Sequence, residues 1–233
     1  MVHGLIVAGL VVALYALVVY GGLITARAKR SDRALLVGLM LAQLPMSAAA
    51  FYGVRAPLDA LVRHLLGASS PLYPWVAITF APLTEEPAKL LPLALPFVWK
   101  RVREGDSEGA AWALGAGFGA GEAIFLSALF ARQAPDLAWY AFSGFVAERF
   151  QVAAIHGLMV SASMRGLTAS PRAAATGVAT AMAMHLSLNL PILLARFGWF
   201  GDDRVRVAQL LFAWVFAWWI VSFARLTQRR ARA

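Results

Sequence analysis

Long apolar stretches dominate the hydrophobic pattern of this chain and alternate with short polar connections. A run of about 20 apolar residues is long enough for an α-helix to cross the hydrocarbon core of a bilayer. The pattern therefore predicts an all-α, polytopic membrane helix bundle that forms one integral membrane domain over residues 1–233. We expect seven spans, at about residues 4–26, 34–53, 72–98, 110–131, 137–163, 173–195 and 207–224. The first run has no basic segment before it and exceeds the ~7–15 apolar residues of a signal peptide, so we expect it to be retained.

The composition agrees with this pattern and excludes several classes of protein. Hydrophobic residues make up 61% of the 233 residues and charged residues only 14%, whereas a typical soluble domain has about 25% charged residues. An ordinary soluble domain and a disordered chain are therefore excluded. The chain has no cysteine, which rules out a disulfide scaffold, a catalytic thiol and thiolate metal ligands.

The basic residues lie mostly in alternate connections between the runs. Of the 21 in the chain, six lie on one side, namely Arg55, Arg63, Arg132, Arg196, Arg204 and Arg206. Thirteen lie on the other side, namely Arg27, Lys29, Arg30, Arg33, Lys100, Arg101, Arg103, Arg165, Arg172, Arg225, Arg229, Arg230 and Arg232. By the positive-inside rule the larger group faces the cytoplasm, which puts the N-terminus outside and the C-terminus in the cytoplasm. The net charge of +9 then orients the chain and attracts anionic lipid, so we expect no nucleic-acid partner.

A small set of ionisable and polar residues falls inside the runs, where charge is costly. A charge at the bilayer centre costs at least ~2.5–3.5 kcal/mol, so such groups pair with one another or face water. Five of them lie about 17–20 Å from their helix ends, near the midplane, namely Glu85, Glu86, Glu122, Glu148 and His185. The set also includes Lys89, Arg149, Asn189 and His156, the last of these about 12 Å nearer the cytoplasm than Glu148.

The segment around Glu85 is predicted to contain the start of a helix. Pro82 and Pro87 favour a broken helix that begins again here, with Thr84 as its cap and Pro87 in its first turn. The two adjacent carboxylates would then lie next to the positive end of the helix dipole. Lys89 is four residues from Glu85 and can pair with it on the same face. A purely structural ion pair at a kink is the alternative.

Glycine spacing in the fourth run predicts close helix packing. Gly115 and Gly119 repeat at an interval of four residues, and so do Gly117 and Gly121. This spacing lets two helix backbones approach closely. The approach would bring Glu122, the next residue, against a neighbouring helix.

Helical spacing also groups the polar residues of the fifth and sixth runs. Arg149 and His156 are seven residues apart and share a face. Glu148 points elsewhere and is either a partner for Arg149 or a structural acid. His185 and Asn189 are four residues apart on one face of the sixth run.

These side chains suffice to hydrolyse a peptide bond without a serine or cysteine nucleophile. A carboxylate can take a proton from water, an imidazole can orient that water or protonate the leaving amine, and Asn and His donors can stabilise an oxyanion. The same groups could instead bind zinc and leave a water position, through Glu85, Glu86, Glu122, His156 and His185. The chain lacks HExxH, an aspartate within a run, a serine nucleophile motif and a lysine in the last run. These absences argue against a zincin, a presenilin-like protease, a rhomboid and a rhodopsin.

Four patterns follow one another along the chain, namely Glu85-Glu86-x-x-Lys89, Phe118-x-x-x-Glu122, His156 and His185-x-x-x-Asn189. In this order they resemble the motifs of PrsW-type glutamic intramembrane proteases, in the superfamily of CAAX prenyl endopeptidases and bacteriocin-immunity-like membrane proteins. The resemblance covers about residues 80–190. It implies a multi-pass protein of the bacterial inner (cytoplasmic) membrane.

The resemblance also implies an activity and roles for the residues. The activity would be hydrolysis of a peptide bond in a single-span, anti-sigma-factor-like membrane protein by a glutamate-activated water. Glu85 or Glu86 would activate the water, and Glu122 would replace the superfamily's second-motif histidine. His185 and Asn189 would form the oxyanion site. The expected catalytic set also contains His156, and the supporting residues are Lys89, Arg149 and Glu148.

We expect no cofactor, with zinc as the alternative. Two other functions stay open. A proton- or ion-coupled transporter also uses buried carboxylates and histidines, although such proteins show internal repeats with paired broken helices and the sequence has no second copy of the 82–89 pattern. A non-catalytic, immunity-type membrane scaffold would keep the polar cluster as a structural network.

Overall fold

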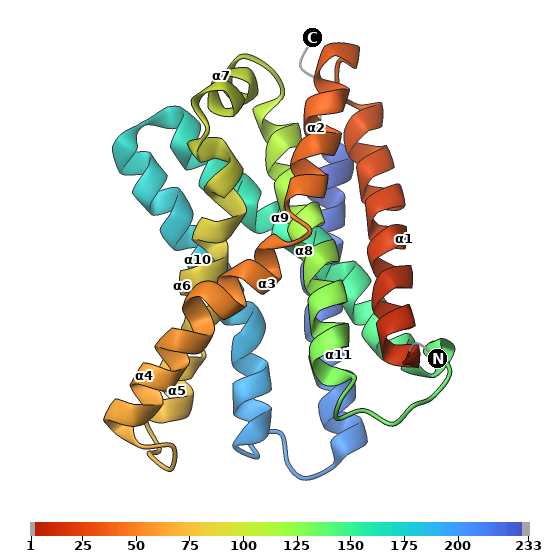
Figure 1. The fold of residues 1–233 in the computed structure, drawn as a ribbon, viewed down its shortest axis with the longest axis vertical. Helices are drawn as coiled ribbons and strands as arrows, with labels where there is room; N and C mark the ends of the chain where they lie inside the picture. Colours follow the sequence, from red (N-terminus) through yellow and green to blue (C-terminus); the bar gives the residue numbers. More distant parts are fainter. Residues whose placement is uncertain (1–2, 230–233) are drawn as a thin grey trace.

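The computed structural model describes residues 3–229, and every regular element in that range is a helix. Figure 1 shows an elongated helix bundle with a short arm, formed by α4 and α5, that projects from it. The α-helices are α1 (Gly4–Ala26), α2 (Arg30–Ala42), α3 (Met46–Ala50), α4 (Ala56–Leu66), α5 (Tyr73–Ala77), α6 (Phe80–Leu90), α7 (Pro96–Glu104), α8 (Ser107–Phe130), α9 (Ser143–Ala169), α10 (Pro171–Arg196) and α11 (Arg204–Gln228). Three short segments connect them, the π-helix η1 (Phe51–Arg55) and the 3₁₀-helices η2 (Leu91–Ala94) and η3 (Trp139–Phe142).

Helix α8 forms the centre of the bundle. It packs against α1, α2, α3 and α9, and its residues from Gly109 to Gly121 are all buried. Within the most apolar stretch of each helix, 61% of the residues are buried in α8 but only 11% in α11. The interior helix is therefore apolar on all sides, while α11 presents large apolar side chains outward, as a lipid-facing helix does.

The glycines of α8 make the close contacts that their spacing predicts. A Cβ atom on Gly115 would collide with the backbone of His156 and Gly157 in α9. A Cβ on Gly117, on the other face, would collide with the backbone of Met40 in α2. Glycine lets α8 touch both neighbours at backbone distance. This contact brings the C-terminal half of α8 against the part of α9 that carries His156.

Four helices of the described chain are long and apolar enough to cross a membrane, namely α1, α8, α10 and α11. Their bounds agree closely with four of the seven expected runs, at 4–26, 110–131, 173–195 and 207–224. The pair formed by α2 and the helix from Met46 to Leu66 also meets these criteria together, with a bend of 44°. Over residues 3–229 the structure thus confirms an all-helical fold with four helices long and apolar enough to cross a membrane, and it does not confirm the number seven.

The second expected span, 34–53, is not one straight helix. It begins earlier, at Arg30, is interrupted between Ala42 and Met46, and continues through η1 into α4. Pro45 lies at the interruption, and proline lacks the N–H that would continue the hydrogen bonding of α2. The chain therefore turns here.

The third expected span, 72–98, is broken at a different place from the one expected. Helix α6 runs unbroken from Phe80 to Leu90, with Thr84 inside it rather than at its start, and its hydroxyl donates to the Phe80 carbonyl oxygen at 2.7 Å. The helix ends at Leu90, and Leu95 is extended before Pro96, because a residue that precedes proline avoids the helical conformation. The paired carboxylates therefore lie in the middle of α6, and the expected location at a helix N-terminus is wrong.

Helix α9 begins at Ser143, six residues after the expected start of its span. In Figure 1 it runs obliquely across the bundle behind α8. Near the other end of the chain, Arg229 donates to Asp106 at 2.6 Å and to the Ile24 carbonyl oxygen at 2.7 Å. The ends of α1 and α11 and the start of α8 therefore lie together. Arg230 and Arg232, which we count among the cytoplasmic bases, lie outside the described residues.

Candidate active site

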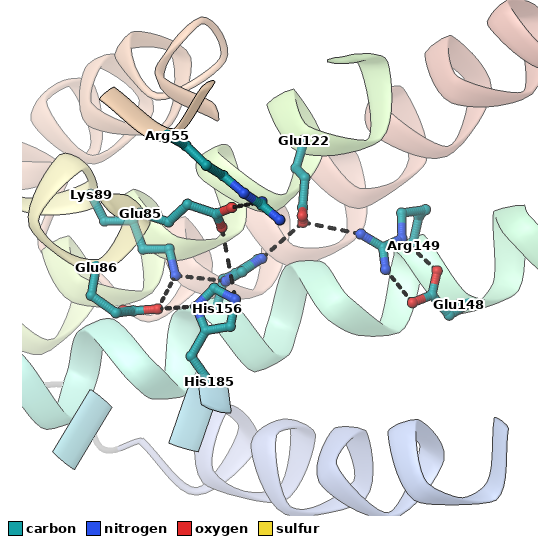
Figure 2. Close-up of polar contacts among 9 residues, drawn as sticks. All are labelled: Arg55, Glu85, Glu86, Lys89, Glu122, Glu148, Arg149, His156 and His185. Carbon is teal, nitrogen blue, oxygen red and sulfur yellow. Dashed lines mark hydrogen bonds and ion pairs between the residues drawn. The ribbon is translucent and has the colours of Figure 1, made fainter. Parts of the chain in front are cut away.

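Five of the six expected catalytic residues converge in one polar cluster inside the bundle. Figure 2 shows them together with four basic or acidic partners. They come from four helices, α6, α8, α9 and α10. The five are Glu85, Glu86, Glu122, His156 and His185.

Lys89 lies at the centre of the cluster and is completely buried. Its ammonium is 2.5 Å from Glu86 Oε1 and 2.7 Å from His156 Nδ1, and it lies 4.9 Å from the centre of the Phe118 ring. Sequence spacing predicts a pair with Glu85, and the actual partner is Glu86, three residues away. Side chains three or four residues apart both meet on a helix face. Here the contact of Lys89 with His156 of α9 holds the ammonium beside Glu86.

The contacts of His156 fix the proton on its ring. An ammonium has only donors, so the Nδ1 atom of His156 accepts from Lys89. The Nε2 atom then carries the hydrogen and donates to Glu122 Oε2 at 3.0 Å. The imidazole is thus a neutral bridge between α6 and α8.

His185 has the opposite tautomer. Its Nδ1 atom is 2.6 Å from Glu86 Oε1, and a carboxylate oxygen only accepts, so Nδ1 donates. In the neutral ring, Nε2 has a free lone pair directed toward Glu85 Oε2, 3.8 Å away. This distance is too long for a direct hydrogen bond and suits a bridging water. Glu85 Oε2 is buried without a hydrogen-bond partner among the described residues, as is Glu86 Oε2.

Arg55 belongs to the cluster although its position in the sequence suggests an outer connection. Its guanidinium is 3.3 Å from Glu85 Oε1. Its side chain is 35% exposed, whereas that of Glu85 is 8% exposed. Arg55 is the last residue of η1, and only the bend after α2 brings it back to α6. No motif in the sequence indicates this contact.

Arg149 extends the cluster toward the start of α9. It is 3.1 Å from Glu122 Oε2 and also pairs with the adjacent Glu148. Arg149 and His156 therefore both contact Glu122, as their shared helix face predicts. Oblique α9 brings His156 into contact with Lys89 and Glu122, whereas Glu148 joins the cluster only through Arg149.

Asn189, the sixth expected catalytic residue, takes no part in the cluster. It is one turn beyond His185 on α10 and is partly buried. Within residues 3–229, no hydrogen bond joins its side chain to the other five. Its contribution to an oxyanion site stays a prediction.

Three members of the cluster have the spacing of a metal site. Ligand atoms of Glu85, Glu122 and His156 lie within 4.8 Å of one another. However, His156 has its two nitrogens engaged, and arginines already pair with both carboxylates. Arg55, Lys89 and Arg149 already pair with Glu85, Glu86 and Glu122, so a divalent ion would have to displace these cations from their carboxylates. The residues present do not fit a resident zinc ion.

Comparisons of the chain with protein-family models, with curated proteins and with solved structures give no match. The family resemblance therefore depends on the four motifs alone. The functional interpretation depends on the geometry of the cluster.

Proposed function

We propose that the chain is a membrane-embedded, glutamic-type endopeptidase that cleaves a single-span membrane protein. The observation that carries the proposal is that Glu85 Oε2, buried and without a hydrogen-bond partner among the described residues, lies 3.8 Å from His185 Nε2. A water there has an acceptor on each side, one of them a carboxylate. General-base catalysis requires this arrangement, a base within hydrogen-bond reach of the water that it deprotonates.

Glu85 is the general base in this proposal. Its Oε1 atom has one contact, with Arg55 at 3.3 Å, and Oε2 is free to face the water. Glu86 is held more firmly, because its Oε1 accepts from both Lys89 and His185. We assign Glu86 the role of fixing the tautomer and orientation of His185, whose Nε2 lone pair helps to position the water. The oxygen of the water forms the new bond to the carbonyl carbon as Glu85 takes its proton, and protonated Glu85 returns that proton to the leaving amine as the C–N bond breaks.

Glu122, His156 and Arg149 form the second half of the site. Arg149 and His156 both donate to Glu122, so hydrogen-bond donors lie on the side of the cluster opposite α6. A bound peptide carbonyl would develop negative charge during attack by water, and preorganised donors stabilise such charge in a dry site. Arg55 and Arg149 are the donors that the cluster offers for it, and the resemblance implies Asn189 as a further one.

The proposed enzyme works without a metal, because basic side chains already pair with its carboxylates. Activity should therefore survive a chelator. Loss of activity with chelator, followed by recovery with zinc, would overturn this part of the proposal.

We propose seven membrane spans in the bacterial inner membrane, with the N-terminus outside and the C-terminus in the cytoplasm. The α6–α7 segment and α9 complete the count, since Glu86 and Lys89 of α6 and Arg149 of α9 form ion pairs inside the bundle. The chain has no cysteine, so single cysteines report topology directly. Ser69→Cys should react with an impermeant maleimide on intact spheroplasts, and Ser170→Cys only after lysis; the reverse pattern would contradict the orientation.

The decisive experiment measures cleavage of a panel of single-span peptides by the purified protein in detergent. Glu85→Gln should lower kcat by about 10²–10⁴-fold while the thermal unfolding temperature stays near that of the unmodified protein. Glu104→Gln is the matched control, since this exposed glutamate lies at the end of α7. Full cleavage by Glu85→Gln would refute the mechanism.

One observation favours a second function, that of a proton-coupled transporter. The polar contacts form a continuous series from partly exposed Arg55 through the buried cluster to partly exposed Glu148, as Figure 2 shows. Buried Glu and His residues in series can relay protons. Proton flux into liposomes without cleavage of any peptide would favour transport over proteolysis. Absence of both activities would favour a non-catalytic scaffold.

A further inference from the structure

A cavity opens on the side of the bundle between α9, α10 and α11, and it meets the edge of the polar cluster at Glu148, whose carboxylate is paired with Arg149. Its volume is about 730 Å³. Its wall is mainly apolar and includes Leu188, Ile192, Leu211, Phe212, Trp214 and Val215. Helices α10 and α11 are both membrane-crossing by length and composition. The occupant of such a cavity therefore comes from the apolar phase of the bilayer.

A second, more polar cavity adjoins the first at the end of the bundle where α10 ends and α11 begins. It measures about 380 Å³ and shares Arg204, Ala208 and Leu211 with the apolar cavity. Arg196 and Asp202 also line it. Within the described chain neither Arg196 nor Arg204 forms an ion pair. Two unpaired guanidinium groups against one carboxylate leave a net positive charge at the mouth of the apolar cavity.

The length of the apolar cavity indicates what fits into it. Its lining on α11 extends from Arg204 to Val215, about 16 Å along the helix axis. One leaflet contributes about half of the ~30 Å hydrocarbon core, so the cavity is as deep as a single leaflet. A transmembrane peptide helix would need the full thickness. An acyl chain needs only this half.

We propose that these two cavities bind one anionic phospholipid, with the phosphate between Arg196 and Arg204 and an acyl chain along α11. A positive polar end joined to an apolar channel of leaflet depth complements a negatively charged headgroup and its chain. With the proposed topology the lipid belongs to the outer leaflet of the inner membrane. The site contacts the polar cluster only at its edge, through Glu148, and contains none of the residues to which we assign catalysis, so this inference does not depend on the proposed protease activity.

The test is native mass spectrometry of the purified, delipidated protein titrated with phosphatidylglycerol. The variant Arg196→Gln/Arg204→Gln should bind this lipid about 30-fold more weakly, from the typical contribution of two surface arginines. Arg132→Gln/Arg206→Gln is the matched control, because both arginines are exposed and line neither cavity. Its affinity should equal that of the unmodified protein. Equal weakening in both double variants would overturn the assignment of the phosphate site.

Three further binding measurements distinguish the contribution of the lipid headgroup from that of the acyl chain. Glycerol 3-phosphate, which has the phosphate and no chain, should not compete at concentrations where phosphatidylglycerol saturates; full competition would indicate a site for free phosphate. Phosphatidylcholine should bind at least tenfold more weakly than phosphatidylglycerol, and equal binding would remove the role of the arginines. Ala208→Phe projects a ring where the two cavities meet and should weaken phosphatidylglycerol binding. Unchanged binding by this variant, with an unchanged unfolding temperature, would overturn the placement of the chain.

Discussion

Replacement of Lys89 by methionine tests whether the buried cluster is held together by its charges. The ammonium is fully buried, 2.5 Å from Glu86 Oε1 and 2.7 Å from His156 Nδ1. Lys89→Met keeps the volume and apolar stem and removes the charge. It leaves a carboxylate that is 1% exposed without its cation. Removal of one partner from a buried ion pair costs about 3–5 kcal/mol.

The expected loss is large enough to measure by thermal unfolding in detergent. For a chain of this size each kcal/mol corresponds to roughly 2–4 °C, so Lys89→Met should unfold about 6–20 °C lower. Lys100→Met is the control, because Lys100 is exposed at the surface and such substitutions change stability by about 0.5 kcal/mol or less.

The double variant Lys89→Met/Glu86→Gln decides between two explanations of the loss. Glutamine at position 86 removes the unpaired charge and still accepts a hydrogen bond from His185. If the isolated carboxylate causes the instability, the double variant should recover at least half of the lost unfolding temperature. Additive loss in the double variant would refute this explanation and would show that Lys89 stabilises the fold through its contacts with His156 and Phe118.

Three further substitutions address packing and the site. Gly115→Ala should lower the free energy of unfolding by about 1–3 kcal/mol because the methyl group meets the backbone of α9, whereas Gly22→Ala, with open space around it, should be neutral or slightly stabilising; denaturation in detergent compares the two. Tyr20→Phe should cost about 1–3 kcal/mol in the same assay, since the indole N–H of Trp219 then loses its acceptor. Arg55→Ala should reduce kcat of peptide cleavage with the unfolding temperature unchanged, and Arg55→Lys should restore part of it; equal kcat in all three proteins would remove Arg55 from the site.

The helices without internal charge are the part of the fold that hydrophobic pattern predicts best. The expected run 4–26 has the same bounds as α1. Helix α11 is longer than its run by several residues at each end, because Arg204 and Gln228 continue the helix beyond the apolar stretch. Hydropathy detects the apolar part of a span, and the polar ends of the helix lie outside that signal.

The breaks in helices were harder to predict because the effect of proline depends on its position. Pro82 is the third residue of α6, where the N–H has no partner within the helix and its loss costs nothing. Pro87 lies inside the same helix without ending it. The actual break comes at Leu95, before Pro96. A local pattern could not rank these three prolines as helix breaks, since packing against α3 and α10 supports α6 across Pro87.

The sequence predicts which acidic and imidazole side chains belong to the polar cluster, because such residues are costly in a membrane unless they meet polar partners. The predicted pairing of these side chains is partly wrong. Burial alone indicates that Glu85, Glu122 and His185 must meet polar partners. It does not indicate that Arg55 supplies one of them, because that contact arises from a bend of 44° far from any motif. The spacing of residues along one helix cannot predict a contact between two segments that only the fold brings together.

The pairing of charges also limits where chemistry can occur. Arg55 pairs with Glu85, Lys89 with Glu86 and Arg149 with Glu122, so the core of the cluster is neutral as a whole. A group saturated by strong contacts cannot also accept a proton from water without breaking them. Glu86 and Glu122 each have two contacts through one oxygen, and these contacts stabilise the ionised carboxylate and lower its tendency to take a proton, although Glu86 Oε2 has no partner in the described chain. Glu85 has a single contact at 3.3 Å, and its other oxygen faces His185 without a partner. If this protein hydrolyses a peptide bond, the electrostatics of the cluster make Glu85 the carboxylate with capacity to do so.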